Sequence, residues 1–185
     1  MKKAVIVLIA LVVPAALWGM DINQGKFELS GQTAFNFSDT TTEVAGSPDI
    51  DETSWSIQLD GNYYVINNLG LGLILQYESS ETEVVGGDID SSTLVIGPQV
   101  TYNISLSPQA SVFVNGAIGY ATVEVENEDA DGYAWQIGVG LKYFLTNSVA
   151  ANGVVSYQSL SLEDDDGNDF DRDGVNVGVG LSVYF

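Results

Sequence analysis

The chain has 185 residues, enough for one domain of ordinary size, and its 25 acidic and 5 basic side chains give a net charge of −20. Such a charge repels the phosphates of nucleic acid, which excludes nucleic acid as a partner. The sequence contains no cysteine, which excludes a disulfide framework.

Residues 1–20 have the pattern of a secretory signal peptide. They begin with Lys2 and Lys3 and continue into an apolar run that Pro14 interrupts, followed by small residues. The run is too short for a typical membrane-spanning helix, so a retained N-terminal anchor is the less favoured alternative. We expect residues 21–185 to form the mature domain.

The rest of the chain alternates apolar with small or polar residues, the period-2 pattern of strands with two unlike faces. In the run 132–144, Tyr133 and Trp135 fall on one face, whereas Gln136 and Gly138 fall on the other. Each predicted strand has at least ten residues, the length that a tilted strand needs to cross a bilayer. The eight predicted strands cover residues 25–38, 53–66, 69–78, 92–104, 110–124, 132–144, 149–162 and 174–185.

Two kinds of connection alternate between these strands. Short, uncharged turns at 67–68, 105–109 and 145–148 alternate with longer acidic segments at 39–52, 79–91, 125–131 and 163–173. This alternation predicts an all-β fold, an eight-stranded antiparallel up-and-down transmembrane β-barrel with turns on one side of the membrane and loops on the other.

The composition of the two faces predicts which one contacts lipid. The polar face is mostly Gly, Ser, Asn and Gln, whereas the exterior of a soluble barrel carries mixed charges. Aromatic residues gather at both ends of the apolar face, as in the two girdles of membrane barrels. The predicted outer girdle is Phe35, Phe37, Trp55, Tyr77, Tyr120, Tyr133, Trp135 and Tyr157, and the inner one is Phe27, Tyr63, Tyr102, Tyr143 and Phe185.

The chain ends in VNVGVGLSVYF, an apolar stripe that finishes at Phe185. With the signal peptide and the eight amphipathic strands, this ending resembles the small outer-membrane β-barrels of Gram-negative bacteria. That family includes the membrane domain of outer membrane protein A, outer membrane protein X and the opacity-type proteins. The resemblance implies an outer-membrane location, periplasmic N- and C-termini and extracellular long loops.

The same resemblance implies that the barrel-assembly machinery reads the last strand, through Phe185 and the adjacent Tyr184. In the family a second aromatic residue usually stands two positions before the last, and here that position is Val183.

Four charged residues fall on the face that is predicted to point into the lumen: Glu28, Asp60, Glu78 and Lys142. An eight-stranded barrel is just wide enough for side chains to fill it, and enclosed carboxylates need partners. We therefore expect Lys142 to form a pair or cluster with these carboxylates and the lumen to be a polar plug. A gated ion path is the alternative.

Catalysis is not expected. Some eight-stranded outer-membrane barrels modify lipid A, but their chemistry needs an activated nucleophile with a nearby base such as histidine, and this sequence contains no histidine. The favoured function is a structural or surface-interaction role of a monomer, through acidic loops that meet an extracellular ligand or surface. A narrow pore or small-solute channel and a lipid-modifying enzyme are the alternatives.

The acidic segment EDDDGNDFDRDG at 163–174 is the candidate metal site. Asp169, Asp171 and Asp173 precede Gly174 in the D-x-D-x-D-G order of calcium loops, with Arg172 as a competing cation. Gly180 stands where an EF-hand has its closing Glu, which excludes that motif. Two interpretations remain: a calcium site, or a solvated tip that keeps the hairpin from aggregating. No other cofactor is expected.

Overall fold

The computed structural model of the chain describes residues 22–40, 50–84, 87–125, 128–164 and 169–185, without the side chains at 36–40, 50–53, 81–84, 87–90, 125, 128–129, 164 and 169–170. Eight strands account for nearly all of these residues. They are β1 (Phe27–Thr40), β2 (Ile50–Ile66), β3 (Leu69–Val84), β4 (Gly87–Ser107), β5 (Ala110–Val125), β6 (Glu128–Phe144), β7 (Val149–Asp164) and β8 (Asp169–Tyr184).

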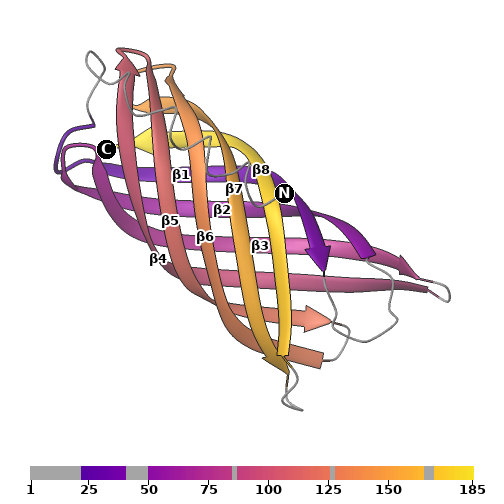
Figure 1. The fold of residues 1–185 in the computed structure, drawn as a ribbon. Coiled ribbons are helices and arrows are strands. Elements are labelled where there is room, and N and C mark those ends of the chain that lie inside the picture. Colours follow the sequence, from indigo (N-terminus) through magenta and orange to yellow (C-terminus); the bar gives the residue numbers. More distant parts are fainter. Residues whose placement is uncertain (1–21, 41–49, 85–86, 126–127, 165–168) are drawn as a thin grey trace, which may run out of the picture.

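The strands form one closed barrel in sequence order, and every neighbouring pair is antiparallel. Closure comes from pairing of β1 with β8, for example Leu29 with Val183. Figure 1 shows the short turns and the C-terminus together at one end of the barrel, which we call the turn end; the opposite end is the loop end. The predicted fold class is confirmed. Among the described residues, no helix is long and apolar enough to cross a membrane.

Most strands are longer than predicted, and most of the extra residues lie at the loop end; β4 also continues to Ser107 at the turn end, into the predicted turn 105–109. Pairing of β3 with β4 continues to Val84 and Gly87, through the segment 79–91 that was predicted to be a loop. Likewise, β8 begins at Asp169, inside the predicted loop 163–173. Beyond the lipid both faces of a strand meet water, so polar and acidic residues can continue a hydrogen-bonded ladder there. The predicted loops at 79–91 and 163–173 are therefore largely strand.

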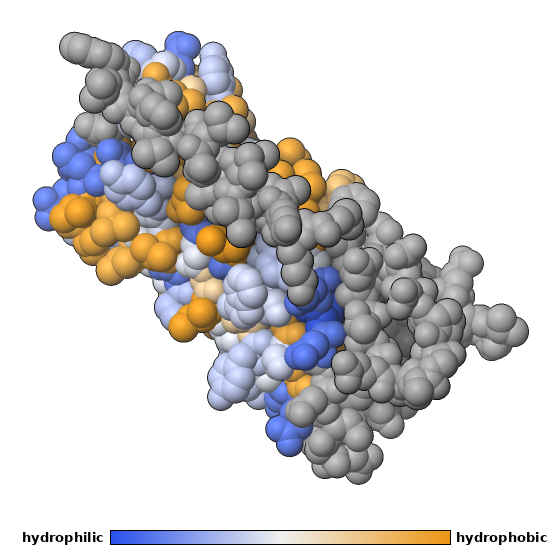
Figure 2. All heavy atoms as spheres, viewed as in Figure 1, coloured by the Kyte–Doolittle hydropathy of each residue, from blue (hydrophilic) through white to orange (hydrophobic). Residues whose placement is uncertain are grey.

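The alternation of side chains confirms the predicted faces. Leu73 and Val179 point outward with 62% and 68% of their surface exposed, whereas Gln76 points inward with 2% exposed. Figure 2 shows apolar residues spread over the outer wall in this view. In water, a barrel with polar side chains outside and apolar side chains inside would be favoured. In a membrane, the apolar outer face contacts lipid, and closure of the barrel gives every backbone N–H and C=O group of the strands a hydrogen-bond partner.

The described aromatic residues of both predicted girdles lie on the outer face. At the loop end, Trp55 on β2 contacts Tyr77 on β3 with ring centroids 6.4 Å apart. At the turn end, Phe27 and Phe185 are also 6.4 Å apart. Phe37 belongs to the predicted outer girdle, but its side chain is outside the described part of the chain.

Candidate functional site

The barrel lumen is the candidate site, because every strand sends buried polar side chains into it. The inward positions alternate with the lipid-facing ones, so each strand contributes every second residue. Among the buried polar residues are Glu28, Gln32, Asp60, Asn62, Gln76, Glu78, Gln99, Asn103, Asn115, Gln136, Lys142, Asn152, Gln158, Asn176 and Ser182.

Lys142 on β6 and Glu28 on β1 form a buried ion pair near the turn end. Lys142 Nζ lies 2.7 Å from Glu28 Oε1 and 2.9 Å from Oε2. The Tyr64 hydroxyl donates to the same carboxylate, and Asn103 Nδ2 donates to that hydroxyl over 3.0 Å. The carboxylate thus receives a charged donor and a hydroxyl donor, which is the condition for keeping a charge in a buried place.

Aromatic rings complete the surroundings of the Lys142 ammonium. Its Nζ lies 4.8 Å from the centroid of the Phe113 ring and 5.8 Å from that of Tyr184. A cation over a ring face is attracted by the ring quadrupole, more strongly where water is excluded. These contacts hold the ammonium beside Glu28.

Glu78 on β3 takes a different cation. Arg172 NH2 on β8 forms an ion pair and hydrogen bond with Glu78 Oε1, which also accepts from Ser54 Oγ over 2.8 Å. Arg172 was predicted to lie in the loop 163–173, and that placement was wrong, because Arg172 lies on strand β8. Arg172 shares its parity with Asn176 and Ser182, which point into the lumen, so extending the period-2 pattern of β8 by one step would have found it.

Asp60 on β2 has only neutral donors. Gln32 Nε2 donates to Asp60 Oδ2 over 3.0 Å, and Gln58 Nε2 donates to Oδ1 over 2.9 Å. Within the described part of the chain, Asp60 forms no ion pair with a lysine or arginine, although it is 4% exposed. The structure therefore brings Lys142 together with Glu28 alone among the three predicted carboxylates.

Apolar clusters lie on both sides of this polar section. At the turn end, Ile22 packs with four inward residues of the wall: Tyr64, Phe144, Ala150 and Tyr184. The Ile22 amide donates to Asn68 Oδ1 and the Asn68 amide donates to the Ile22 carbonyl, both over 2.9 Å. Toward the loop end, β4 to β7 contribute a second cluster, formed by Val95, Ala121, Ala134, Leu160 and Leu162.

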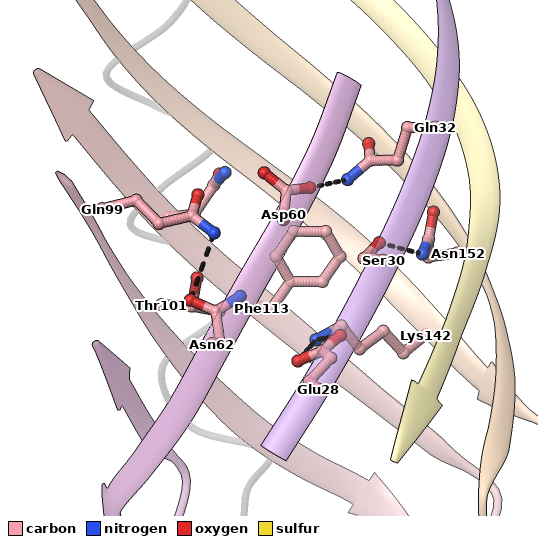
Figure 3. Close-up of a pocket in the computed structure, with 11 residues that line it drawn as sticks. Glu28, Ser30, Gln32, Asp60, Asn62, Gln99, Thr101, Phe113, Lys142 and Asn152 are labelled. Carbon is pink, nitrogen blue, oxygen red and sulfur yellow. Dashed lines mark hydrogen bonds and ion pairs between the residues drawn. The ribbon is translucent and has the colours of Figure 1, made fainter. Parts of the chain in front are cut away.

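Between the clusters lies a small cavity of about 10 Å³, room for about one water-sized particle. Figure 3 shows Asp60, Gln99 and Asn62 around it, with the Glu28–Lys142 pair at one side.

The side chains of the last two residues point in opposite directions. Phe185 is 67% exposed and packs on Phe27 at the outer face, where the two residues exchange backbone hydrogen bonds of 2.9 and 3.2 Å. Tyr184 points into the lumen and is 4% exposed. Of the two residues in the predicted assembly signal, only Phe185 is therefore presented on the outer face.

The candidate calcium residues lie on strand β8, in a row. Asp171 and Asp173 are exposed on the outer face, and the Tyr157 hydroxyl bonds to Asp173. The side chain of Asp169 lies outside the described residues. Alternate strand residues are separated by about 6.6 Å, whereas calcium needs oxygens that converge to about 2.4 Å from the ion. The described side chains contain no group of three or more metal-ligating residues.

A titration distinguishes the two interpretations of this segment. We expect calcium to change the melting temperature of the refolded protein equally in the parent and in the double variant Asp171→Asn, Asp173→Asn, as surface charge requires. Magnesium is the control, because it demands tighter octahedral geometry. A saturable rise that calcium alone produces, and that the double variant loses, would establish a calcium site instead.

Comparisons with known proteins agree with this architecture. A family model described as outer membrane protein beta-barrel domain matches residues 4–182. The comparison with curated proteins found no match.

Three solved structures have a similar fold. Neisserial surface protein A is 14% identical, covering 88% of this chain and 100% of that chain with a TM-score of 0.63. OprG from Pseudomonas aeruginosa is 15% identical, covering 88% and 97% with a TM-score of 0.57. Ail, the attachment invasion locus protein of Yersinia pestis, is 14% identical, covering 88% and 99% with a TM-score of 0.52. At these identities the likeness is one of fold. Since the family model spans nearly all of the sequence, the chain belongs to the outer membrane protein beta-barrel domain family and is a transmembrane barrel of the outer membrane.

Proposed function

We propose that this protein is a closed outer-membrane barrel with a structural or surface-interaction role, without transport or catalysis. The observation that carries the proposal is the filled lumen. Two ion pairs and a network of amides occupy its middle, and apolar side chains pack toward both ends. Eight strands leave an interior that side chains can fill, so this network acts as a plug.

Single-channel recording in planar bilayers tests this proposal. We expect the refolded protein to give no steady conductance steps, because the described inward side chains are buried and fill the lumen. The variant Ile22→Gly removes the Ile22 side chain from the apolar cluster at the turn end. It serves as the control in which conductance is most easily detected. Steady, large steps from the parent would replace the plug with the alternative of a narrow pore.

Catalysis is not supported by the lumen. Glu28 and Glu78 are each engaged by a cation, and Asp60 accepts from two amides. A general base needs access to the proton that it removes, and these carboxylates are enclosed in the wall. Together with the absence of histidine from the sequence, this arrangement argues against a lipid-modifying enzyme.

We further propose that the loop end is extracellular and that the turn end, with both termini, is periplasmic. Exposed carboxylates gather toward the loop end, at Glu124, Asp131, Glu163, Asp171 and Asp173. Such a surface suits a basic extracellular ligand or surface, since opposite charge speeds encounter. The barrel closes on itself and leaves no free strand edge, which supports a monomer surrounded by outer-membrane lipid. Phe185 is the residue on which we would expect the barrel-assembly machinery to act.

Thiol labelling tests the orientation, and a chain without cysteine is well suited to it. On intact cells, a membrane-impermeant maleimide should label Asp166→Cys, between β7 and β8. Ser148→Cys, in the turn between β6 and β7, should react only after the outer membrane is permeabilised. The reverse pattern would invert the proposed orientation.

A further inference from the structure

The outer wall of the barrel has a groove over β4, β5 and β6, which are neighbours in the sheet (Figure 1). Its volume is about 720 Å³, within the range of about 300–1,000 Å³ that is usual for ligand pockets. Gly116 on β5 lies in the groove, opposite Val100 on β4 and Ile137 on β6. These two side chains project from the wall with 43% and 42% of their surface exposed, so the missing side chain of Gly116 leaves a gap between them.

Pro98 on β4 widens this gap. Its ring is short, and it has no N–H to donate to the neighbouring strand. The pairing of β4 with β5 accordingly passes from Ile96–Tyr120 to Gln99–Ala117 without a pair at Pro98. The groove therefore follows from the sequence, which places a glycine and a proline side by side on a wall of larger apolar side chains.

The groove lies at the depth of the hydrocarbon. Tyr102 of the inner girdle and Trp135 of the outer girdle both line it. Tyr102 is opposite Val114 and Trp135 is opposite Ile118, so the two aromatic residues are four positions of β5 apart, about 13 Å. The hydrocarbon core of a bilayer is about 30 Å thick and covers this whole length. Whatever fills the groove is therefore apolar.

We propose that the groove is a binding site for one acyl chain of a membrane lipid, which stays there when other lipids exchange. An apolar hollow that stays empty loses the dispersion contacts of its lining. An acyl chain is narrow and flexible enough to lie between Val100 and Ile137 on the backbone at Gly116. A second barrel is convex and would contact the rims of the groove before its floor. The site is on the outside of the wall, so it does not depend on whether the lumen is closed.

Retention of a brominated lipid tests the proposal, because bromine quenches the fluorescence of a tryptophan that it contacts. The chain has three tryptophans, Trp18, Trp55 and Trp135. The variant Trp18→Phe, Trp55→Phe keeps only Trp135, in the groove, and Trp18→Phe, Trp135→Phe keeps only Trp55, on β2. Both are refolded in vesicles of a phosphatidylcholine with bromine halfway along its chains and are then transferred into excess dodecyl maltoside. We expect Trp135 to remain quenched in detergent, whereas Trp55 recovers its fluorescence.

Two matched substitutions in the variant that keeps Trp135 complete the experiment. Gly116→Leu fills the groove and should restore the fluorescence of Trp135 in detergent. Gly153→Leu places the same side chain on the outer face of β7, outside the groove, and should leave Trp135 quenched. Both glycines have room for a side chain, because the nearest atom to an added Cβ is 3.8 Å away at Gly116 and 3.9 Å away at Gly153.

Three results would overturn the proposal: recovery of Trp135 in detergent without any substitution in the groove, persistent quenching in Gly116→Leu, or equal recovery in Gly116→Leu and Gly153→Leu. Gly116→Val is the replacement if the leucine variant does not refold. Sedimentation of the parent in the same detergent adds a check. A dimer that Gly116→Leu converts into a monomer would assign the groove to a second copy of the chain instead of a lipid.

Discussion

Replacing Lys142 with Met is expected to lower the free energy of unfolding by about 3–5 kcal/mol, the usual effect of removing one partner of a buried ion pair. The variant leaves the Glu28 carboxylate buried in the lumen without its cation, although the Tyr64 hydroxyl still donates to it. The methionine nearly matches the volume of the lysine stem, so lost packing contributes little. Urea-induced unfolding in lipid vesicles, followed by tryptophan fluorescence, measures the change.

Two variants separate the charge effect from other effects of the substitution. Adding Glu28→Gln to Lys142→Met removes both charges and should recover most of the lost stability, because replacing a whole buried pair is often nearly neutral. Arg172→Met breaks the second pair, whose arginine side chain is 16% exposed, and water there should make the loss smaller. If the Glu28→Gln, Lys142→Met double variant were no more stable than Lys142→Met, the loss would not come from the unpaired carboxylate.

Replacing Val139 with Arg is expected to cost about 2–4 kcal/mol, the penalty for a cation on the lipid face near the midplane of a membrane barrel. Val139 lies on the outer face of β6, between Ile137 and Leu141, which are both exposed to lipid. An arginine there must lose hydration or bend toward a lipid boundary. The same vesicle unfolding experiment gives the magnitude.

A second arginine on the same strand and face provides the matched control. Tyr133 lies in the predicted outer girdle and is 76% exposed. Because an arginine at the lipid–water interface keeps its hydration, Tyr133→Arg should lower the free energy of unfolding by only about 0–1 kcal/mol. Equal penalties at both positions would mean that Val139 does not lie deeper in the bilayer than Tyr133.

The faces of the strands could be predicted from the sequence, because period-2 alternation depends on the residues alone. Leu73 and Gln76 fall on opposite faces of β3 in both the sequence pattern and the structure. The ends of the strands could not be predicted from the sequence. The apolar signal stops where the lipid stops, but the hydrogen-bonded ladder continues, and only backbone pairing such as that of Val84 with Gly87 reveals it.

The sequence also could not predict which side chains in the lumen form ion pairs with one another. The alternation along each strand predicts which charged side chains point into the lumen: Glu28, Asp60, Glu78 and Lys142. Which of these side chains contact one another depends on the tilt of the strands and on their positions around the barrel. Lys142 and Glu28 are 114 residues apart in the chain, on strands that are not neighbours in the sheet. Arg172 was missed for a different reason, since its acidic neighbours made a strand position look like a loop.

The position of Ile22 has a consequence for the start of the barrel wall. Its side chain is buried at the turn end, and its amide and carbonyl both bond to Asn68. Asn68 lies in the turn between β2 and β3, and Ile22 lies five residues before β1 begins. The first strand is therefore moored to a turn two strands away before it enters the sheet, in addition to its pairing with β2 and β8.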